Sequence, residues 1–260
     1  MNWPNTLAGF GVGTLVGLTG VGGGSLMAPI LILIFGYPPA VAVGTDLWFA
    51  AITKTAGGVI HHHYGGPDFQ IIRRLCYGSL PACVVTLWFL AHAGRTQIKS
   101  GTIIHVLGVA IALTGAATLL RGRLQAASRK VRTSTAEAFL RVQPAMTVLA
   151  GAVLGVLVTL TSVGAGALAA TMLVMLYPLR LTPHRLVGTD IVHAIPLTLI
   201  AGLGYLWIGN VNAPLLGQLL LGSLPGIIIG SFFAARIPEF GLRTALAAVL
   251  SLVGLRMVLT

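Results

Sequence analysis

The sequence has very few charged residues for its length. Its 260 residues include 16 Lys and Arg and only 5 Asp and Glu, so 8 % of the chain is charged, against roughly 25 % in soluble domains. Hydrophobic residues make up 56 %. Such a chain cannot cover a water-facing surface, which excludes a soluble enzyme and a disordered protein. The composition favours a polytopic α-helical membrane protein, because helices satisfy their own backbone hydrogen bonds in lipid.

Cysteine and catalytic motifs are also scarce. The two cysteines, Cys76 and Cys83, lie seven residues apart on one apolar run, which indicates buried packing residues rather than a disulfide or a metal pair. There is no Ser/His/Asp set, no pair of neighbouring carboxylates and no Cys-x-x-Cys. We therefore expect no enzymatic activity, no metal and no cofactor. The net charge of +11 comes without a basic run on a polar domain, so we expect it to set membrane orientation rather than to bind nucleic acid.

Ten apolar segments alternate with charges and turn residues. Six of them approach or exceed the length that spans a bilayer, which is about 20 residues. The other four form two pairs, and the second member of each pair has only about 12 residues, too short to cross a bilayer alone. The segments are 5–20, 25–36, 39–63, 70–93, 98–120, 143–162, 166–177, 184–208, 213–235 and 242–259.

The chain is an internal duplication. Val-Gly-Thr-Asp at 43–46 recurs at 187–190, and Gly-Ser-Leu-Pro at 78–81 recurs at 222–225, both 144 residues later. The Gly-rich breaks inside the two short pairs match at an offset of 142, with Thr19 opposite Thr161. We expect a first transmembrane repeat over 1–120, a basic cytoplasmic linker over 121–142 and a second repeat over 143–260.

Positive charge distinguishes two arrangements of the repeats, because Lys and Arg are enriched on the cytoplasmic side. If each broken pair crosses once, the halves are parallel, with six cations outside and eight inside. If each pair is a hairpin or two short spans, the halves are inverted and twelve of the 16 cations lie inside. Only Arg95, Lys99 and Arg256 then fall outside, with Lys54 in the membrane. The charges favour two inverted-topology repeats, each a short broken or re-entrant helix pair plus three transmembrane helices.

The two Gly-rich breaks have the features of an anion site. The start of a helix leaves backbone N–H groups free and carries a partial positive charge, and glycine lets a ligand approach the backbone closely. Small residues also permit close helix packing without any ligand, which is the alternative explanation. The predicted substrate-binding residues of the breaks are Thr19, Gly22, Gly23, Gly24, Ser25, Thr161, Ser162, Gly164, Ala165 and Gly166.

Ionisable residues inside the predicted spans are the second signal, because they are costly in lipid and often functional. Asp46 and Asp190 occupy equivalent places near the starts of two spans. They would shape the site or carry coupling protons; alternatively, each complements the dipole of its own helix. His193 shares a helix face with Asp190. Lys54, deep in the span 39–63, would bind the substrate anion or pair with Asp46. The set of polar coupling or structural residues is completed by Thr45 and Thr189.

These motifs resemble the sulfite exporter TauE/SafE family, also called the toluenesulfonate uptake family. The resemblance rests on the run Gly13, Gly17, Gly20, Gly22, Gly23, Gly24 and Ser25, on Pro29, on Gly-Thr-Asp at 44–46, and on a weaker copy in the second half. It implies an inner-membrane permease for sulfur-containing anions. The second break has Ala165 between two glycines and departs from the family's Gly-Gly-Gly form, so it would contact a substrate less closely.

From the residues and the resemblance together we expect a multi-pass secondary transporter of the inner membrane. Its substrate would be a small sulfur-containing anion such as sulfite or an organosulfonate. The alternatives are an anion channel, a transporter of another small carboxylate or oxyanion, and a partner subunit of an intramembrane enzyme. Its expected partners are the substrate anion and the lipid bilayer, with protons as the candidate coupling ion and a homodimer as the candidate assembly.

Overall fold

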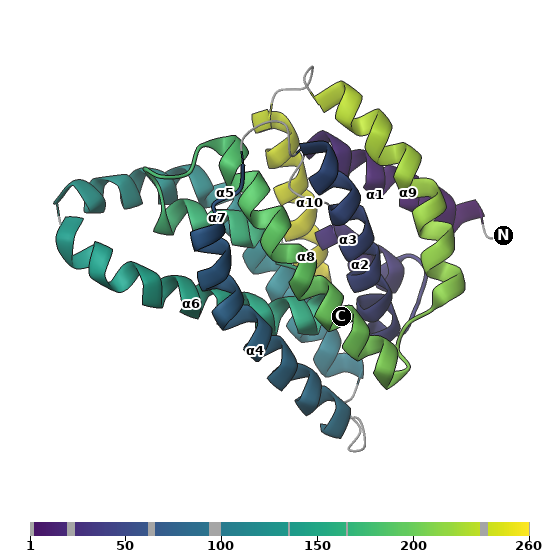
Figure 1. Cartoon of the computed structure of the whole chain (residues 1–260). Helices are drawn as coiled ribbons and strands as arrows, with labels where there is room; N and C mark the ends of the chain where they lie inside the picture. The colour runs from purple at the N-terminus through teal and green to yellow at the C-terminus, as the bar shows by residue number, and fades with distance from the viewer. Residues whose placement is uncertain are drawn as a thin grey trace.

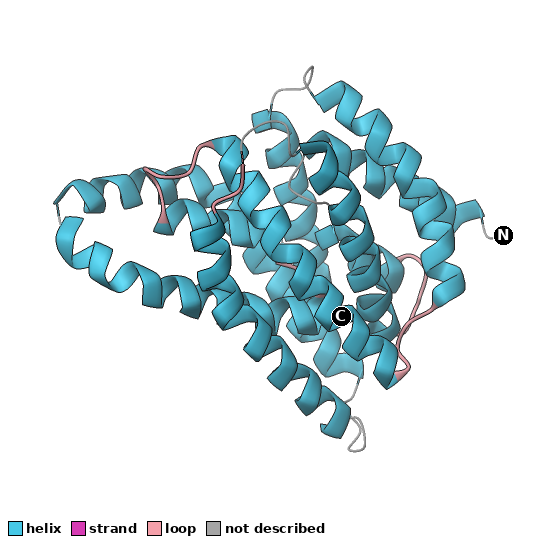
Figure 2. Cartoon of the chain, in the orientation of Figure 1, coloured by secondary structure: helices cyan, strands magenta, loops and turns pink. Residues whose placement is uncertain are grey.

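Each of the ten apolar segments forms a helix (Figure 1). The computed structural model describes residues 3–19, 24–61, 66–93, 100–134, 136–164, 166–234 and 239–259. In these ranges all regular structure is helical (Figure 2), which confirms the predicted all-α class. The helices are α1 (Trp3–Thr19), α2 (Gly24–Leu33), α3 (Pro39–His61), α4 (Phe69–Ala93), α5 (Ser100–Ser134), α6 (Ala136–Thr161), α7 (Ala167–Leu176), α8 (Pro183–Ile208), α9 (Ala213–Ala234) and α10 (Glu239–Leu259).

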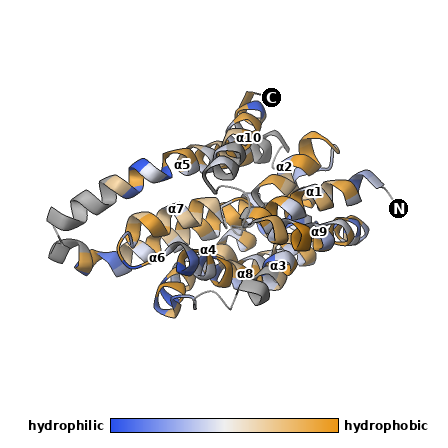
Figure 3. Cartoon of the chain, turned by 90° about the horizontal axis from the view of Figure 1, so that it is seen from above, coloured by the Kyte–Doolittle hydropathy of each residue, from blue (hydrophilic) through white to orange (hydrophobic). Residues whose placement is uncertain are grey.

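The helices have the length and surface of membrane spans. Within the described ranges, five apolar stretches are long enough to cross a bilayer: Phe69–His92, Leu107–Ala126, Leu140–Thr161, His184–Ile208 and Ala213–Phe233. Large apolar side chains lie on the outside of the bundle; Trp207 is 84 % exposed and Phe232 79 %. Figure 3 shows apolar residues along most helices. Such a surface suits contact with lipid.

The basic stretch 121–142 is built from helix extensions. Helix α5 continues to Ser134 and α6 begins at Ala136. With its 35 residues, α5 is about 50 Å long at 1.5 Å per residue, longer than the roughly 30 Å hydrocarbon core. The two helices project beyond the rest of the bundle (Figures 1 and 3). The pattern of apolar residues could not predict this extension. Ala, Arg and Lys favour helix outside a membrane too, so a helix can continue after its apolar residues end.

The main helix pairs each join one helix from the first half of the chain to one from the second half, and the two halves exchange equivalent partners. Helix α1 packs along α9 on one flank, as α6 packs along α4 on the other, while α3 pairs with α8 and α5 with α10. In Figure 1 the α3 and α8 labels lie between these two flanks. Such an exchange is expected when a two-fold axis relates two repeats. That this axis makes the repeats inverted in the membrane stays a prediction based on the charges.

Glycines allow the flanking pairs to approach closely. A Cβ on Gly13 of α1 would meet the backbone carbonyl of Ser223 on α9, and a Cβ on Gly155 of α6 would meet that of Ser79 on α4. Gly13 and Gly155 are 142 residues apart, and Ser79 and Ser223 are 144 apart. The duplication therefore repeats a helix contact and not only a sequence motif. This is the close small-residue packing that helices use in lipid.

Replacing Gly155 with valine should destabilise the protein by about 2 kcal/mol or more. The added side chain collides with backbone, which cannot move without separating α4 and α6, and overpacking of this kind typically costs 1–3 kcal/mol. Gly217→Val on α9 is the matched control, because nothing lies within 4 Å of its Cβ position. Thermal unfolding of both variants in one detergent measures the difference. Equal midpoints would contradict the contact.

Candidate functional site

The second break contains three residues with positive φ. Helix α6 ends at Thr161, and Ser162 (φ 57°), Gly164 (φ 116°) and Gly166 (φ 155°) follow. Gly166 is the N-cap of α7 and offers no side-chain cap. The first amides of α7, including that of Leu168, have no carbonyl one turn earlier in the same helix. The predicted break is therefore confirmed as a helix interruption, and the start of α7 carries a partial positive charge. Of its first amides, that of Ala169 is bonded to the carbonyl of Gly164 at 3.1 Å.

The start of α2 and the second break share buried apolar clusters. Ala28 belongs to the same buried apolar cluster as Val158 near the end of α6, and Leu26 belongs to the same cluster as Val163. Of the predicted substrate-binding residues, Gly24 is the first residue of α2. The described part of the structure excludes Gly22, Gly23 and Ala165, and also the side chains of Thr19 and Ser25.

Asp46 connects α3 to α2 and to the break that follows α6. Its carboxyl is fully buried, and its Oδ2 accepts a hydrogen bond from the backbone N–H of Ala28 at 3.3 Å. The hydroxyl of Ser162 lies beside the same carboxyl. One carboxylate oxygen thus anchors α2, and the carboxyl also interacts with the Ser162 hydroxyl.

Lys54, Asp190 and His193 complete a buried polar cluster on α3 and α8. Lys54 is 3 % exposed and interacts electrostatically first with Asp190 and then with Asp46. Both carboxylate oxygens of Asp190, and Nδ1 of His193, make no hydrogen bond in the described part of the chain. His193 Nε2 is hydrogen-bonded to Ser79 Oγ of α4 at 2.9 Å. The structure thus brings together the charged residues that the sequence singled out.

The predicted hydroxyl residues outside this cluster hold helix ends. Thr189 Oγ1 accepts from the backbone N–H of Asp68 at 3.0 Å, and Thr45 Oγ1 accepts from that of Asn212 at 3.1 Å. Asp68 and Asn212 directly precede α4 and α9, and each accepts an amide of the following first turn. The hydroxyl of Thr161 donates to the carbonyl of Leu157 in α6 and accepts from the backbone N–H of Val163.

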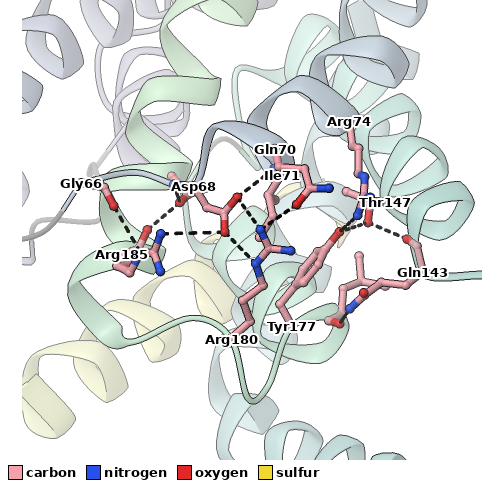
Figure 4. A network of polar contacts seen from close by, with 12 residues as sticks. Gly66, Asp68, Gln70, Ile71, Arg74, Gln143, Thr147, Tyr177, Arg180 and Arg185 are labelled. Atoms are coloured by element: carbon pink, nitrogen blue, oxygen red, sulfur yellow. Dashed lines mark hydrogen bonds and ion pairs between the residues drawn. The ribbon is translucent and has the colours of Figure 1, made fainter. Parts of the chain in front are cut away.

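A charged network lies where the loop after α7 meets the start of α4 (Figure 4). Asp68 is 4 % exposed and accepts from Arg180 Nε at 2.8 Å and Nη2 at 3.0 Å. Arg185 approaches the same carboxylate at 4.0 Å. Nearby, the hydroxyl of Tyr177 bonds to Thr147 at 2.7 Å. The sequence interpretation missed this network, although Asp68 and its counterpart Asn212 both have the N-cap pattern that predicts a helix start.

The other half of the chain has an uncharged version of these contacts. Asn5, the counterpart of Thr147 at an offset of 142, donates to the hydroxyl of Tyr37 at 3.4 Å and to Gln218 at 2.8 Å. Gln218 corresponds to Arg74, which donates to Tyr177 at 3.3 Å. One set of these helix contacts is therefore made by neutral hydrogen bonds, and its counterpart in the other half includes ion pairs.

Asp68→Ala should lower the free energy of unfolding by about 1–2 kcal/mol, because it removes the N-cap of α4. Asp68→Asn should cost less than Asp68→Ala, since the counterpart Asn212 makes the same cap. The ion pair itself adds little, as the Arg180 side chain is 41 % exposed and water screens it. Midpoints of thermal unfolding compare the two variants. If Asp68→Asn loses as much as Asp68→Ala, the ion pair and not the cap dominates.

Comparison with known proteins agrees with this architecture. The family described as "Sulfite exporter TauE/SafE" matches residues 6–257. Probable membrane transporter protein YjnA of Bacillus subtilis is 36 % identical over 208 residues, which cover 79 % of this chain and 80 % of the relative. Probable membrane transporter protein YdhB of the same organism is 26 % identical over 208 residues, or 80 % of each chain. No solved structure matches the chain significantly.

The family match spans almost all ten helices, and it covers both breaks and the buried cluster of α3 and α8. The resemblance carried by the glycine run and by Gly-Thr-Asp at 44–46 is therefore confirmed. The chain is a multi-pass membrane transporter that belongs to the sulfite exporter TauE/SafE family.

Proposed function

We propose that the chain is a secondary transporter for a small sulfur-containing anion, such as sulfite or an organosulfonate, and that it works by alternating access around the two helix breaks near the membrane midplane. The observation that supports this proposal is a buried polar cluster that both the short helix α2 and the break between α6 and α7 reach. Asp46 bonds to α2 and lies beside the second break, while Lys54 interacts with Asp46 and Asp190. Short helices meeting at a polar centre are typical of transporters.

The anion would bind to backbone amides and one cation. At the start of α7 the amides of Ala167 and Leu168 have no acceptor within their helix, whereas that of Ala169 is bonded to Gly164. Lys54 is buried and interacts electrostatically with Asp190 and Asp46. Amides and a helix dipole bind anions without a full positive charge, which suits a substrate that must also leave. The proposed contact residues are Thr19, Gly22, Gly23, Gly24, Ser25, Lys54, Thr161, Ser162, Gly164, Ala165 and Gly166.

The buried acids have a second role in this scheme. Asp46 and Asp190 would shape the site or carry the protons that couple transport to a gradient, and His193 would assist Asp190 from the same helix face. Thr45 and Thr189 would keep the two acid-bearing helices in place through the helix ends that they hold. We further propose the plasma (inner) membrane as the location, a homodimer as the assembly and no enzymatic activity.

Substrate-dependent stability and flux test this function. Purified protein would be screened by thermal shift against sulfite, thiosulfate, sulfoacetate, taurine and sulfate, with acetate and succinate as carboxylate probes. We expect a saturable rise in the unfolding midpoint with one sulfur-containing anion, and saturable counterflow of that anion in proteoliposomes. A response to the carboxylates alone would contradict the sulfur assignment. Flux that does not saturate and shows no counterflow would identify an anion channel.

A further inference from the structure

His193 of α8 is buried and hydrogen-bonded at only one of its two ring nitrogens. The side chain is 1 % exposed. Its Nε2 lies 2.9 Å from Ser79 Oγ of α4, whereas its Nδ1 makes no hydrogen bond with any described residue. A histidine in a helix can place Nδ1 on the carbonyl four residues earlier, as His92 does with Trp88 at 2.8 Å. His193 does not make this bond, so its second nitrogen is open to a further partner.

Ser79 decides which ring nitrogen carries the proton. The ring is expected to be neutral, because an imidazolium would lie beside the buried Lys54 and place two positive charges together in the protein interior. Ser79 is fully buried, and within the described residues its hydroxyl is bonded to His193 alone. A proton on Nε2 would leave both the hydroxyl hydrogen and a bare Nδ1 unsatisfied. A proton on Nδ1 lets the hydroxyl donate to Nε2 and leaves only the Nδ1–H without a partner. Buried unsatisfied groups are costly, so the second arrangement is favoured.

The charged groups near this N–H favour an anion as its acceptor. His193 interacts electrostatically with Lys54 of α3. Asp190, one turn earlier on α8, interacts with Lys54 and with Arg121 of α5, and its carboxylate accepts no hydrogen bond from the described residues. The acid therefore has two cations near it and does not take the histidine donor. A hydrogen bond from a neutral N–H to an ionised acceptor is about twice as strong as one to a neutral acceptor.

The first repeat shows that packing does not require a histidine at this position. The counterpart of His193 is Phe49, which is fully buried, and the counterpart of Ser79 is Ser223. With no histidine opposite, Ser223 Oγ donates to the carbonyl of Leu220 in its own helix at 3.5 Å. The contact of α3 with α9 thus repeats that of α8 with α4 without this pair. The histidine and its open donor belong to one half only.

We propose that the Nδ1–H of His193 donates a hydrogen bond to the transported anion beside Lys54, and that Ser79 is a positioning residue that keeps this proton on Nδ1. This inference rests on the proposed transport function and specifies one contact of its substrate site. It assigns His193 to binding the anion rather than to carrying protons. The site is then asymmetric, because α3 supplies a cation and α8 a neutral donor, and an oxyanion has acceptor oxygens for both.

Anion-dependent stability tests the contact. Sulfite and sulfoacetate would be titrated separately into the full chain in detergent, and the apparent Kd taken from the rise of the unfolding midpoint. His193→Phe copies the residue of the first repeat and should weaken anion binding by about 10-fold or more, as expected for the loss of one hydrogen bond to a charged group. His193→Asn retains an N–H donor near the position of Nδ1 and should recover most of the affinity. Unchanged affinity in His193→Phe would overturn the proposal.

Ser79→Ala separates positioning from packing. Without the serine, the proton distributes over both ring nitrogens, so the apparent Kd should rise by about two-fold or more, in proportion to the lost fraction of the binding tautomer. Ser223→Ala is the matched control, because that hydroxyl is bonded within its own helix and its removal should leave the affinity unchanged. If the two variants bind the anion equally well, Ser79 does not position the donor.

The tautomer can be measured without any substrate. In protein with isotope-labelled histidine, the nitrogen NMR signals of His193, assigned by their absence in His193→Phe, should show a neutral ring protonated at Nδ1 near neutral pH. Protonation at Nε2 would overturn the inference, and a doubly protonated ring would overturn it in favour of a proton carrier. If the unmodified protein binds neither anion, the proposed function fails and this role fails with it. If it binds them and His193→Phe binds them equally, only the role of His193 fails.

Discussion

Lys54→Met is expected to abolish transport and to destabilise the protein strongly. The lysine is 3 % exposed and interacts electrostatically with the opposite charges of Asp190 and Asp46. Removing one partner of a buried charge pair leaves the other uncompensated, which typically costs 3–5 kcal/mol. In the proposed site the same substitution also removes the cation that meets the anion, so flux should fall by about 100-fold or more. Thermal unfolding and counterflow in proteoliposomes measure the two effects.

A double variant separates the two roles of Lys54. Lys54→Met with Asp190→Asn removes both charges of the stronger pair, so most of the lost stability should return, as neutral replacement of a buried pair is often tolerated. Anion-dependent stabilisation should stay absent. Recovery of anion binding in the double variant would show that Lys54 only balances Asp190 and does not contact the substrate. Asp190→Asn alone provides the reference for the effect of the acid.

The sequence predicted the helices well because their determinants are local. Every break between apolar segments was marked by glycine, proline or charge, and each of the ten segments became a helix. The duplication also anticipated equivalences that the structure contains, since Thr45 and Thr189 hold corresponding helix ends. The helical extension of α5 and α6 was not expected, because a basic stretch can be helical or irregular with the same composition.

The contacts inside the cluster could not be predicted in the same way. Hydrophobic periodicity states which face of a helix is buried, but it does not identify the helix opposite. The hydrogen bond between Ser79 and His193 joins residues 114 positions apart and exists only in one half, because the counterpart of His193 is the buried Phe49. The left-handed conformation of Ser162 was also hidden, since serine gives no signal for positive φ.

Gly166→Ala is expected to reduce transport by at least about 10-fold. Gly166 has φ 155° and ψ −102° at the N-cap of α7, a conformation that residues with a Cβ rarely adopt. An alanine there would shift the start of α7 away from its present direction, and with it the amides proposed to bind the anion. Displacements of about 1 Å at a binding site are enough for losses of this size. Flux per folded protein in proteoliposomes is the measurement.

Gly209→Ala distinguishes this positional effect from simple strain. Gly209 ends α8 in the left-handed conformation, with φ 86°, and no atom lies within 4 Å of its Cβ position. Alanine should therefore cost about 1 kcal/mol there without moving either break. Both variants should lower the unfolding midpoint, but only Gly166→Ala should impair anion binding and flux. If the two variants transport equally well, the start of α7 does not bind the anion, and the substrate site must be sought among the side chains of α3 and α8 alone.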